Sequence, residues 1–418
     1  MKKRFIAFVL FLALVFSMAG VLSACEVASA NSVDLMQGIT ANEVDTEVKM
    51  TGSGAVAVTD FAVRLFQNSM TVGESSLISP VSVLYALAMT ANGSRGESRA
   101  QMEEVIGLSV EEMNEYLHVW QKWLTKRGDR YKLSIANAIW FKDVESFTVN
   151  EDFLQTNADY YGAGIYKAPF DKTTCRDINN WVSQNTDKMI DGIIDEIPDD
   201  AVMYLVNALA FDAEWETIYK SSQVREGVFT SEKGEEQQAD FMYSTLREYL
   251  EDDLATGFVK QYAGGRYAFV AMLPNEGVSV AEYVQSLTGE HLHDLLSEPQ
   301  TVEVRTSLPK FETEYEAELS EVLKTMGMVM PFVKGLEGVG TSTEDIYMAI
   351  SRVMHKTFIT VDEKGTKAGT ATAVVMAPGS APPPKEYKEV YLDRPFVYLI
   401  IDHVTKSPIF IGTVMDVG

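Results

Sequence analysis

The chain has 418 residues, 46% of them hydrophobic, and its 35 basic and 60 acidic side chains give a formal net charge of −25. This length and hydrophobic content allow a large buried core. The acidic balance contains no Lys/Arg-rich run, which argues against binding to nucleic acid or to anionic lipid surfaces.

The N-terminus has the pattern of a targeting segment. Basic residues from Lys2 to Arg4 precede the apolar run Ile6–Phe16, as in a secretory signal. Leu22-Ser23-Ala24-Cys25 then resembles the lipobox of bacterial lipoproteins, which predicts cleavage after residue 24 and a lipid on Cys25. Ordinary signal cleavage with an incidental cysteine is the alternative. The first interpretation places the protein outside the cytoplasm of a bacterium, on the cell surface or in the periplasm, with a membrane anchor.

Residues 25–55 are mostly polar and small, which predicts a flexible spacer between the anchor and a folded domain. The other cysteine, Cys175, is predicted to be a small buried hydrophobic residue rather than a reactive thiol. If Cys25 is lipidated, no intramolecular disulfide can form.

From residue 56 the pattern changes to that of one folded domain, 56–418. Apolar spacing predicts helices over Val58–Leu65, Val81–Thr90, Glu111–Leu124 and Arg176–Met189. Ser79-Pro80 suits the start of the second helix and Asn92-Gly93 suits its end. Branched and aromatic residues predict strands over Arg266–Leu273, Val302–Arg305, Thr357–Val361, Phe396–Ile401 and Ile409–Val414. The predicted fold class is α+β, with helices mainly early and strands mainly late.

One late segment, residues 362–380, is competent to form a strand but leads into Pro382, Pro383 and Pro384. Proline lacks the N–H that a sheet needs, so this strand has no evident place to end.

Motifs of common enzymes are missing from the sequence. It has no G-x-S-x-G, P-loop, G-x-G-x-x-G or H-E-x-x-H motif, so catalytic turnover is not predicted. His291 and His293 have no identifiable partner ligands, and a solvated helix face is the simpler interpretation. No metal or other cofactor is expected.

Several short motifs together resemble the serpin family of protease inhibitors over Val56–Gly418. Glu363-Lys364-Gly365-Thr366 and Ala368–Ala373 are similar to the hinge of a serpin reactive-centre loop. The other matching segments are Ile78–Ser82, Leu205–Ala208, Phe211–Trp215, Leu308–Phe311, His355-Lys356, Asp393–Tyr398 and Ser407–Gly412. The chain departs from the common family pattern at Ser75, Ala213 and Lys367, and its loop is longer than in many members.

The resemblance implies a single serpin domain with a large central sheet, further sheets, eight or nine helices and an exposed reactive-centre loop at about residues 364–392. A protease would cut this loop and form an acyl-enzyme, and the cut loop would then enter the main sheet as a new strand. Counting from the hinge glycine places the reactive bond at Gly379–Ser380, and the longer loop leaves Met376–Ala377 as the alternative.

Two further sets of site residues follow from the resemblance. The polar network beneath the sheet, called the shutter, would comprise Ser79, Ser82, Asn207 and His355. The breach, where insertion begins, would comprise Trp215, Lys310 and Glu363, with an ion pair between the last two. The hinge itself would comprise Glu363, Gly365, Thr366, Ala368, Gly369, Thr370, Ala371 and Thr372.

The hinge composition satisfies a physical requirement of insertion. Side chains alternate between the two faces of a sheet, so Thr366, Ala368 and Thr370 share the face that would be buried. These side chains are small and uncharged, whereas Lys367 falls on the face that can stay wet. The sequence therefore predicts an irreversible inhibitor of serine proteases, with cysteine proteases as a second target class, that is itself no enzyme. A non-inhibitory serpin acting as a binding or carrier protein is the alternative.

The expected partners follow from the loop. No Lys or Arg lies between Lys367 and Lys385, which disfavours trypsin-like targets. Small neutral residues suit elastase-like, subtilisin-like or papain-like proteases. The expected assembly state is a monomer.

Overall fold

The computed structural model describes residues 32–343, 348–366 and 386–417, in which nine α-helices surround two large sheets. The helices are α2 (Ser53–Ser69), α3 (Pro80–Ala91), α4 (Gly96–Ile106), α5 (Val110–Leu124), α6 (Glu151–Tyr161), α7 (Lys172–Asn185), α8 (Val280–Ser286), α9 (Gly289–Ser297) and α10 (Ser320–Thr325). In the part of the chain that is described, no helix is long and apolar enough to cross a membrane. The predicted α+β class is confirmed.

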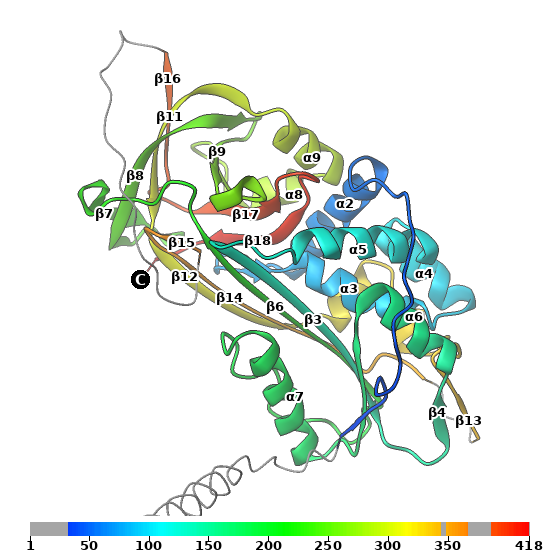
Figure 1. The fold of residues 1–418 in the computed structure, drawn as a ribbon. Helices are drawn as coiled ribbons and strands as arrows, with labels where there is room; N and C mark the ends of the chain where they lie inside the picture. The colour runs from blue at the N-terminus through cyan, green and yellow to red at the C-terminus, as the bar shows by residue number, and fades with distance from the viewer. Residues whose placement is uncertain (1–31, 344–347, 367–385, 418) are drawn as a thin grey trace, which may run out of the picture.

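The main sheet has seven strands in the order β1-β5-β3-β6-β15-β14-β12 (Figure 1). Their bounds are β1 (Val33–Asp34), β3 (Tyr131–Lys142), β5 (Gly164–Ala168), β6 (Met203–Glu214), β12 (Phe311–Glu318), β14 (Arg352–Val361) and β15 (Gly365–Thr366). Helix α7 covers one face of this sheet, and the bundle that contains α3 and α5 covers the other (Figure 1). The first four strands of this order come from the N-terminal half of the chain and the last three from the C-terminal half, so the sheet joins the two halves between β6 and β15.

The second sheet is strongly bent and runs in the order β16-β11-β8-β9-β10-β17-β18-β2, with β7 paired to β8. Its strands are β2 (Leu77–Ile78), β7 (Val224–Thr230), β8 (Glu236–Glu251), β9 (Ala255–Gln261), β10 (Tyr267–Pro274), β11 (Gln300–Pro309), β16 (Tyr387–Tyr391), β17 (Phe396–Asp402) and β18 (Pro408–Val414). A small separate sheet pairs β4 (Phe147–Val149) with β13 (Gly340–Ser342).

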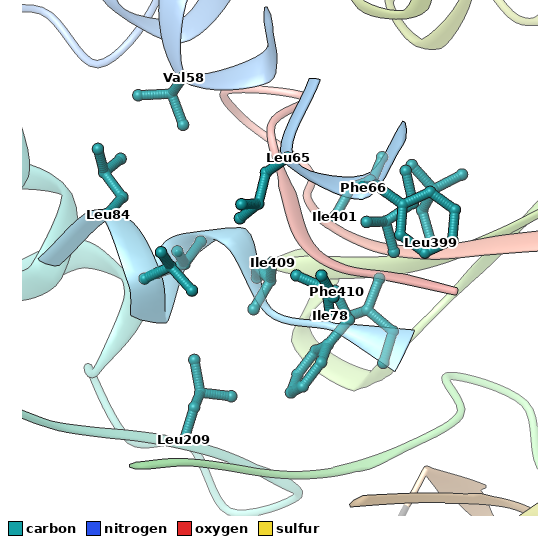
Figure 2. Close-up of a cluster of buried hydrophobic side chains, with 14 of the residues drawn as sticks. Val58, Leu65, Phe66, Ile78, Leu84, Leu209, Leu399, Ile401, Ile409 and Phe410 are labelled. Atoms are coloured by element: carbon teal, nitrogen blue, oxygen red, sulfur yellow. The ribbon is translucent and has the colours of Figure 1, made fainter. Parts of the chain in front are cut away.

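The largest core lies where α2 and α3 pack on β17 and β18. Figure 2 shows Leu65 and Phe66 of α2 directed toward Leu399 and Ile409 of these strands. Every residue of β17 and of β18 is buried, which explains why both contain an unbroken apolar run, 396–401 and 408–412, rather than an alternating pattern. The core joins the first helices to the last strands, and this long-range contact fixes both ends of the domain.

Local signals explain where two helices begin. Helix α5 starts one residue before its predicted bound, because Ser109 and Glu112 form a reciprocal capping box. Helix α7 spans Lys172–Asn185 and not the predicted 176–189. The side chain of Asp171 accepts hydrogen bonds from the backbone N–H groups of residues 173 and 174, so the helix begins four residues earlier.

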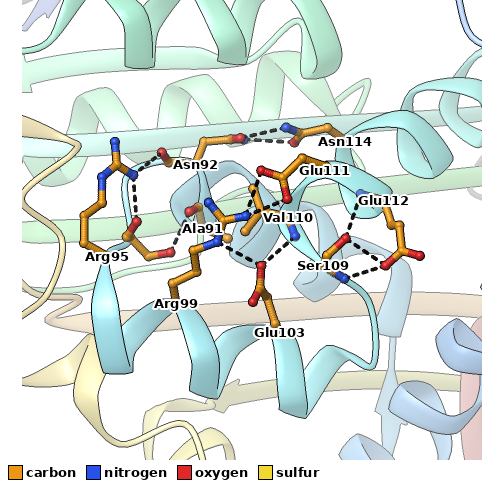
Figure 3. A network of polar contacts seen from close by, with 11 residues as sticks. Ala91, Asn92, Arg95, Arg99, Glu103, Ser109, Val110, Glu111, Glu112 and Asn114 are labelled. Carbon is orange, nitrogen blue, oxygen red and sulfur yellow. Dashed lines mark hydrogen bonds and ion pairs between the residues drawn. The ribbon is translucent and has the colours of Figure 1, made fainter.

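A polar network joins the ends of α3, α4 and α5 (Figure 3). Arg99 pairs with Glu103 at 2.9 Å and with Glu111 at 2.6 Å. Asn92 and Asn114 exchange two side-chain hydrogen bonds of 3.1 and 2.8 Å. The Asn92 amide is therefore occupied in holding α3 to α5.

The predicted flexible spacer is wrong for the part of it that is described. Val33–Asp34 forms β1 and pairs with β5 at the edge of the main sheet. Further along, Leu35, Ile39 and Val48 pack against the core. These apolar residues are scattered among polar ones, so the overall composition of the segment does not reveal that it packs against the folded domain.

Candidate functional site

The site centres on a division between two strands of the main sheet. At one end of the sheet β6 and β14 pair directly, from Tyr204–Arg352 to Asn207–His355. At the other end β15 lies between them, with Thr366 opposite Ala213 on one side. Between these two places, residues 208–212 and 356–360 are not paired with one another in the described chain. A further strand can therefore add to this part of the sheet.

The hinge is held tightly where it enters the sheet. A Cβ atom on Gly365 would lie 2.0 Å from the carbonyl oxygen of Ala213, so only glycine fits. Thr366 is 1% exposed, and its hydroxyl hydrogen-bonds to that of Tyr262. Its side chain faces the buried side of the sheet, as predicted.

Backbone hydrogen bonds hold the hinge from the neighbouring loop. The backbone N–H of Trp215 donates to the carbonyl of Lys364 at 2.8 Å. The backbone N–H of Tyr219 donates to the carbonyl of Glu363, also at 2.8 Å. The indole of Trp215 donates to the carbonyl of Asp362 at 2.8 Å. Three bonds that do not depend on the hinge side chains thus set its starting position.

The predicted ion pair at the breach is confirmed as a contact, with 3.0 Å between Lys310 Nζ and Glu363 Oε2. Lys310 also pairs with Asp240 at 3.3 Å, a partner that the sequence did not indicate. Burial raises the pKa of Glu363, but its backbone hydrogen bond and the Lys310 ammonium outweigh burial and lower the pKa below its ordinary value. The pair is ionised at neutral pH and links the hinge to the second sheet.

A buried lysine beneath the breach is unexpected from the sequence. Trp215 stacks on Tyr262 with ring centroids 4.5 Å apart. Lys260 is 4% exposed, and its ammonium lies 4.2 Å from the ring centre of Tyr219 and 5.1 Å from that of Trp215. Burial lowers the pKa of Lys260 to about 7. Nothing in the sequence signalled that Lys260 would be buried here, since it lies in a strand that contains no acidic residue.

The predicted shutter residues lie together at the point where β6 and β14 part. Asn207 is opposite His355, and Asn137 of β3 is opposite Asn207, so the three form one row across the sheet. The backbone N–H of Ser79 donates to His355 Nε2 at 3.2 Å, and Ser82 donates its hydroxyl to the Ser79 carbonyl at 3.0 Å. Asn137, which the sequence did not indicate, hydrogen-bonds to Asn207.

This network is incompletely satisfied. Among the described residues no partner reaches the Oγ of Ser79, the Nδ1 of His355 or the side-chain oxygen of Asn207, although all three are buried. His355 is 1% exposed, and burial lowers its pKa to about 4, so its imidazole is neutral at physiological pH. Buried polar groups without a protein partner are costly, and these three lie where β6 and β14 begin to pair directly.

Other predicted site residues lie outside the described residues. These are Cys25, the rest of the hinge (Ala368, Gly369, Thr370, Ala371 and Thr372) and both candidate reactive bonds, Gly379–Ser380 and Met376–Ala377.

No group of three or more His, Cys, Asp or Glu side chains in the described ranges is arranged to hold a metal ion. His291 instead lies 3.2 Å from Asp252. Cys175 is a free thiol that is buried, as expected for a small apolar residue.

The sequence model for "Serpin (serine protease inhibitor)" matches residues 56–417. The chain belongs to the serpin family. Serpins are generally protease inhibitors rather than catalysts. Human neuroserpin is 26% identical, over 86% of this chain and 90% of its own length. A serpin-like protein of Thermococcus kodakarensis is 27% identical, over 86% of this chain and 85% of its own length.

Two solved structures of one thermophilic serpin match more closely. Tengpin, a thermophilic serpin, in its native state is 46% identical with a TM-score of 0.87, covering 92% of this chain and 100% of that one. Tengpin in its latent state gives a TM-score of 0.77 at 43% identity, covering 90% of this chain and 100% of that one. The fold of this serpin is thus more similar to the native-state structure than to the latent one.

Proposed function

We propose that this serpin is an irreversible, single-use inhibitor of serine proteases that acts by inserting its cut loop into the main sheet. One observation carries the proposal: the first hinge residues, Gly365–Thr366, are already paired between β6 and β14. Beyond them, residues 208–212 of β6 and 356–360 of β14 are not paired with one another in the described chain, so further loop residues can pair there. A loop cut on the far side of the hinge can continue this strand without changing its register. About a dozen added hydrogen bonds at roughly 1 kcal/mol each would drive insertion.

The register of β15 predicts where each loop residue would arrive. Thr366 is opposite Ala213 and the pairing is antiparallel. Thr372, six residues later in the loop, would therefore meet Asn207, six residues earlier in β6. This is the row of His355, where β6 and β14 begin to pair directly. Insertion beyond Thr372 must therefore separate β6 from β14. The incompletely satisfied shutter lies where this separation would start.

The proposed chemistry needs only a peptide bond from this serpin. The serine hydroxyl of the protease attacks the carbonyl carbon of Gly379, or of Met376 at the alternative bond. The peptide C–N bond breaks, and the new amine of Ser380, or of Ala377, leaves with a proton. The serpin stays attached to the protease through an ester. Insertion then moves this ester along the sheet before water can hydrolyse it.

The proposed targets are elastase-like and subtilisin-like serine proteases, with papain-like cysteine proteases as a further class. The loop offers small neutral side chains on both sides of the candidate bonds and no basic residue between Lys367 and Lys385. A pocket that needs Lys or Arg finds no partner there.

We also propose that the protein is a bacterial lipoprotein anchored through Cys25 outside the cytoplasm. The basic, apolar and small-residue order before Cys25 supports this proposal. Since β1 begins at Val33, only seven residues separate the lipid from the folded body. Metabolic labelling with a radioactive fatty acid tests the proposal, and an unlabelled protein that Cys25→Ser does not change would contradict it.

One experiment separates inhibition from the carrier alternative. The protein is mixed with elastase-like, subtilisin-like and papain-like proteases, run on a denaturing gel, and the released C-terminal fragment is sequenced. A covalent complex and loss of protease activity support inhibition, and the first residue of the fragment identifies the reactive bond. Cleavage without a complex, and without a gain in thermal stability, supports a non-inhibitory serpin.

A further inference from the structure

One exposed surface of the second sheet has no assigned role. It is the outer face of β7, β8, β11 and β16, at the margin of the molecule away from the helices (Figure 1). The strand registers place Tyr243, Ser307 and Tyr391 in one row, and Thr245, Arg305 and Glu389 in the next. The face, called the outer face below, comprises Arg225, Tyr243, Thr245, Arg247, Glu303, Arg305, Tyr387, Glu389 and Tyr391.

The composition of the outer face is that of a binding surface. Tyr387 is 44% and Tyr391 is 37% exposed, and they are among the few large apolar side chains left exposed in the described chain. The guanidinium of Arg305 lies 3.7 Å from the ring centre of Tyr387. The guanidinium of Arg225 lies 5.5 Å from the ring centre of Tyr243. Tyrosine and arginine are the residues that most often dominate binding energy at protein interfaces.

Two arginines of the outer face are available to a partner. Arg305 is engaged with carboxylates of its own chain, at 3.8 Å from Glu389 and 4.0 Å from Glu303. In contrast, no carboxylate of the described residues lies within 4 Å of Arg225 or Arg247, and both are exposed. In a chain with 60 acidic and 35 basic residues, two such cations on one face favour an acidic partner.

The outer face is hollowed where a partner's side chains can enter. A depression of about 260 Å³ is lined by Phe241, Tyr243 and Tyr391, among others. A second, of about 540 Å³, lies beside Arg247 and Thr245. The first depression is mainly aromatic, with Asp393 at its edge, and the second sets Arg247 beside Glu303 and Glu386. A protruding apolar side chain can be buried in the first, and Arg247 lies at the edge of the second.

The position of the outer face identifies the partner. Strand β16 begins at Tyr387, seven residues after Ser380, so at most about 25 Å of extended chain separates the predicted bond from the face. A protease of about 230 residues is roughly 45 Å across. A protease seated on the bond, or on the alternative three residues earlier, is therefore large enough to reach the outer face.

We propose that the outer face is a second contact surface for the target protease and that it selects proteases with acidic side chains beside their active site. This inference rests on the proposed inhibitory function. The net charge of −25 repels an acidic protease at long range. The free guanidinium groups of Arg225 and Arg247 offset that repulsion at the place where the protease must approach.

The test uses a subtilisin-like protease in two forms, with four exposed positions beside its active site set either to Glu or to Gln. The rate constant of association is measured for the unsubstituted serpin and for Arg225→Glu/Arg247→Glu. The matched control is Lys49→Glu/Lys122→Glu, which makes the same charge change at exposed residues remote from the outer face. We expect association with the Glu form to slow by about 10-fold or more for the arginine variant and by less than about 2-fold for the control.

Each result has one meaning. An equal loss for the arginine variant and the control, or for the Glu and Gln proteases, would overturn the inference. If the unsubstituted serpin forms covalent complexes normally in that case, the proposed function stands. Failure of the unsubstituted serpin to form any covalent complex overturns both. Thermal melting checks folding, and Arg225→Gln/Arg247→Gln replaces the Glu pair if that variant melts early.

Discussion

His355 makes the stability of this serpin depend on pH in a direction that the structure fixes. Its folded pKa of about 4 lies below the ordinary value of 6.5, since burial disfavours the charged imidazole. The folded state therefore binds fewer protons than the unfolded state between these values. The contribution of neutral His355 to the free energy of unfolding is fully present above pH 6.5 and is lost as the pH falls toward 4.

The size of the effect follows from the two pKa values. Between pH 8 and pH 5, linkage predicts a loss of about 2 kcal/mol from this one group. For a chain of this size, with roughly 2 cal/mol/K of unfolding entropy per residue, that corresponds to a melting shift of about 2–3 °C. His355 also closes the last direct pair between β6 and β14, so its protonation should ease strand separation.

The assay compares thermal melting at pH 8 and pH 5, at one scan rate, for the unsubstituted protein and His355→Gln. The unsubstituted protein should lose about 2–3 °C more than the variant over this range. Burial also lowers the pKa values of His118 and His403, but both are present in each protein and cancel in the comparison. Identical pH slopes would refute the reasoning, as would a measured His355 pKa near 6.5 if the variant folds poorly.

Substitutions in and below the hinge give three further tests. Gly365→Val places a side chain against the carbonyl of Ala213, so we expect cleavage of the loop without a covalent complex on a denaturing gel; retained complexes would contradict this. Ala368→Glu should bury a charge on insertion at a cost of several kcal/mol, raising the stoichiometry of inhibition more than about 10-fold. The matched Lys367→Glu should change it less than about 2-fold, and equal effects would show that the predicted facing is wrong. Lys260→Met should raise the melting temperature at pH 7, because burial lowers the pKa of Lys260 in the folded state to about 7 from an ordinary value of 10.5. Between these two pKa values the unfolded lysine binds more protons than the folded one, so the unsubstituted protein gains stability as the pH rises and the advantage of the variant shrinks toward pH 10. A variant melting no higher than the unsubstituted protein at pH 7 would count against a costly buried ammonium.

Elements with strong local signals were predictable from the sequence. Ser79-Pro80 and Asn92-Gly93 mark α3 to within a residue or two, and the apolar run at 396–401 marks β17. The start of α7 was missed because its cap, Asp171, precedes the apolar pattern by several residues. Where a cap and a periodic pattern are separated, the pattern alone places the helix too late.

Contacts across the sheets were not predictable from local patterns. The ion pair of Lys310 with Glu363 came from family resemblance and is present. Lys260 and Asn137 gave no signal, since their importance depends on which strands become neighbours. Pairing partners lie tens to hundreds of residues apart, and no local propensity encodes them.

The placement of β1 has a mechanical consequence for an anchored protein. Val33 lies in the row of the main sheet that contains Met203, at the end of β6 far from the hinge. Extending the register of Thr366 by ten residues brings Met376 to that same row. If Cys25 carries a lipid, the chain between Cys25 and Val33 spans at most about 27 Å when extended, which is less than the roughly 45 Å width of a protease. Insertion of the cut loop would then carry the protease to the end of the sheet nearest the bilayer. The protease and the membrane would occupy the same space unless the serpin lies tilted on the membrane.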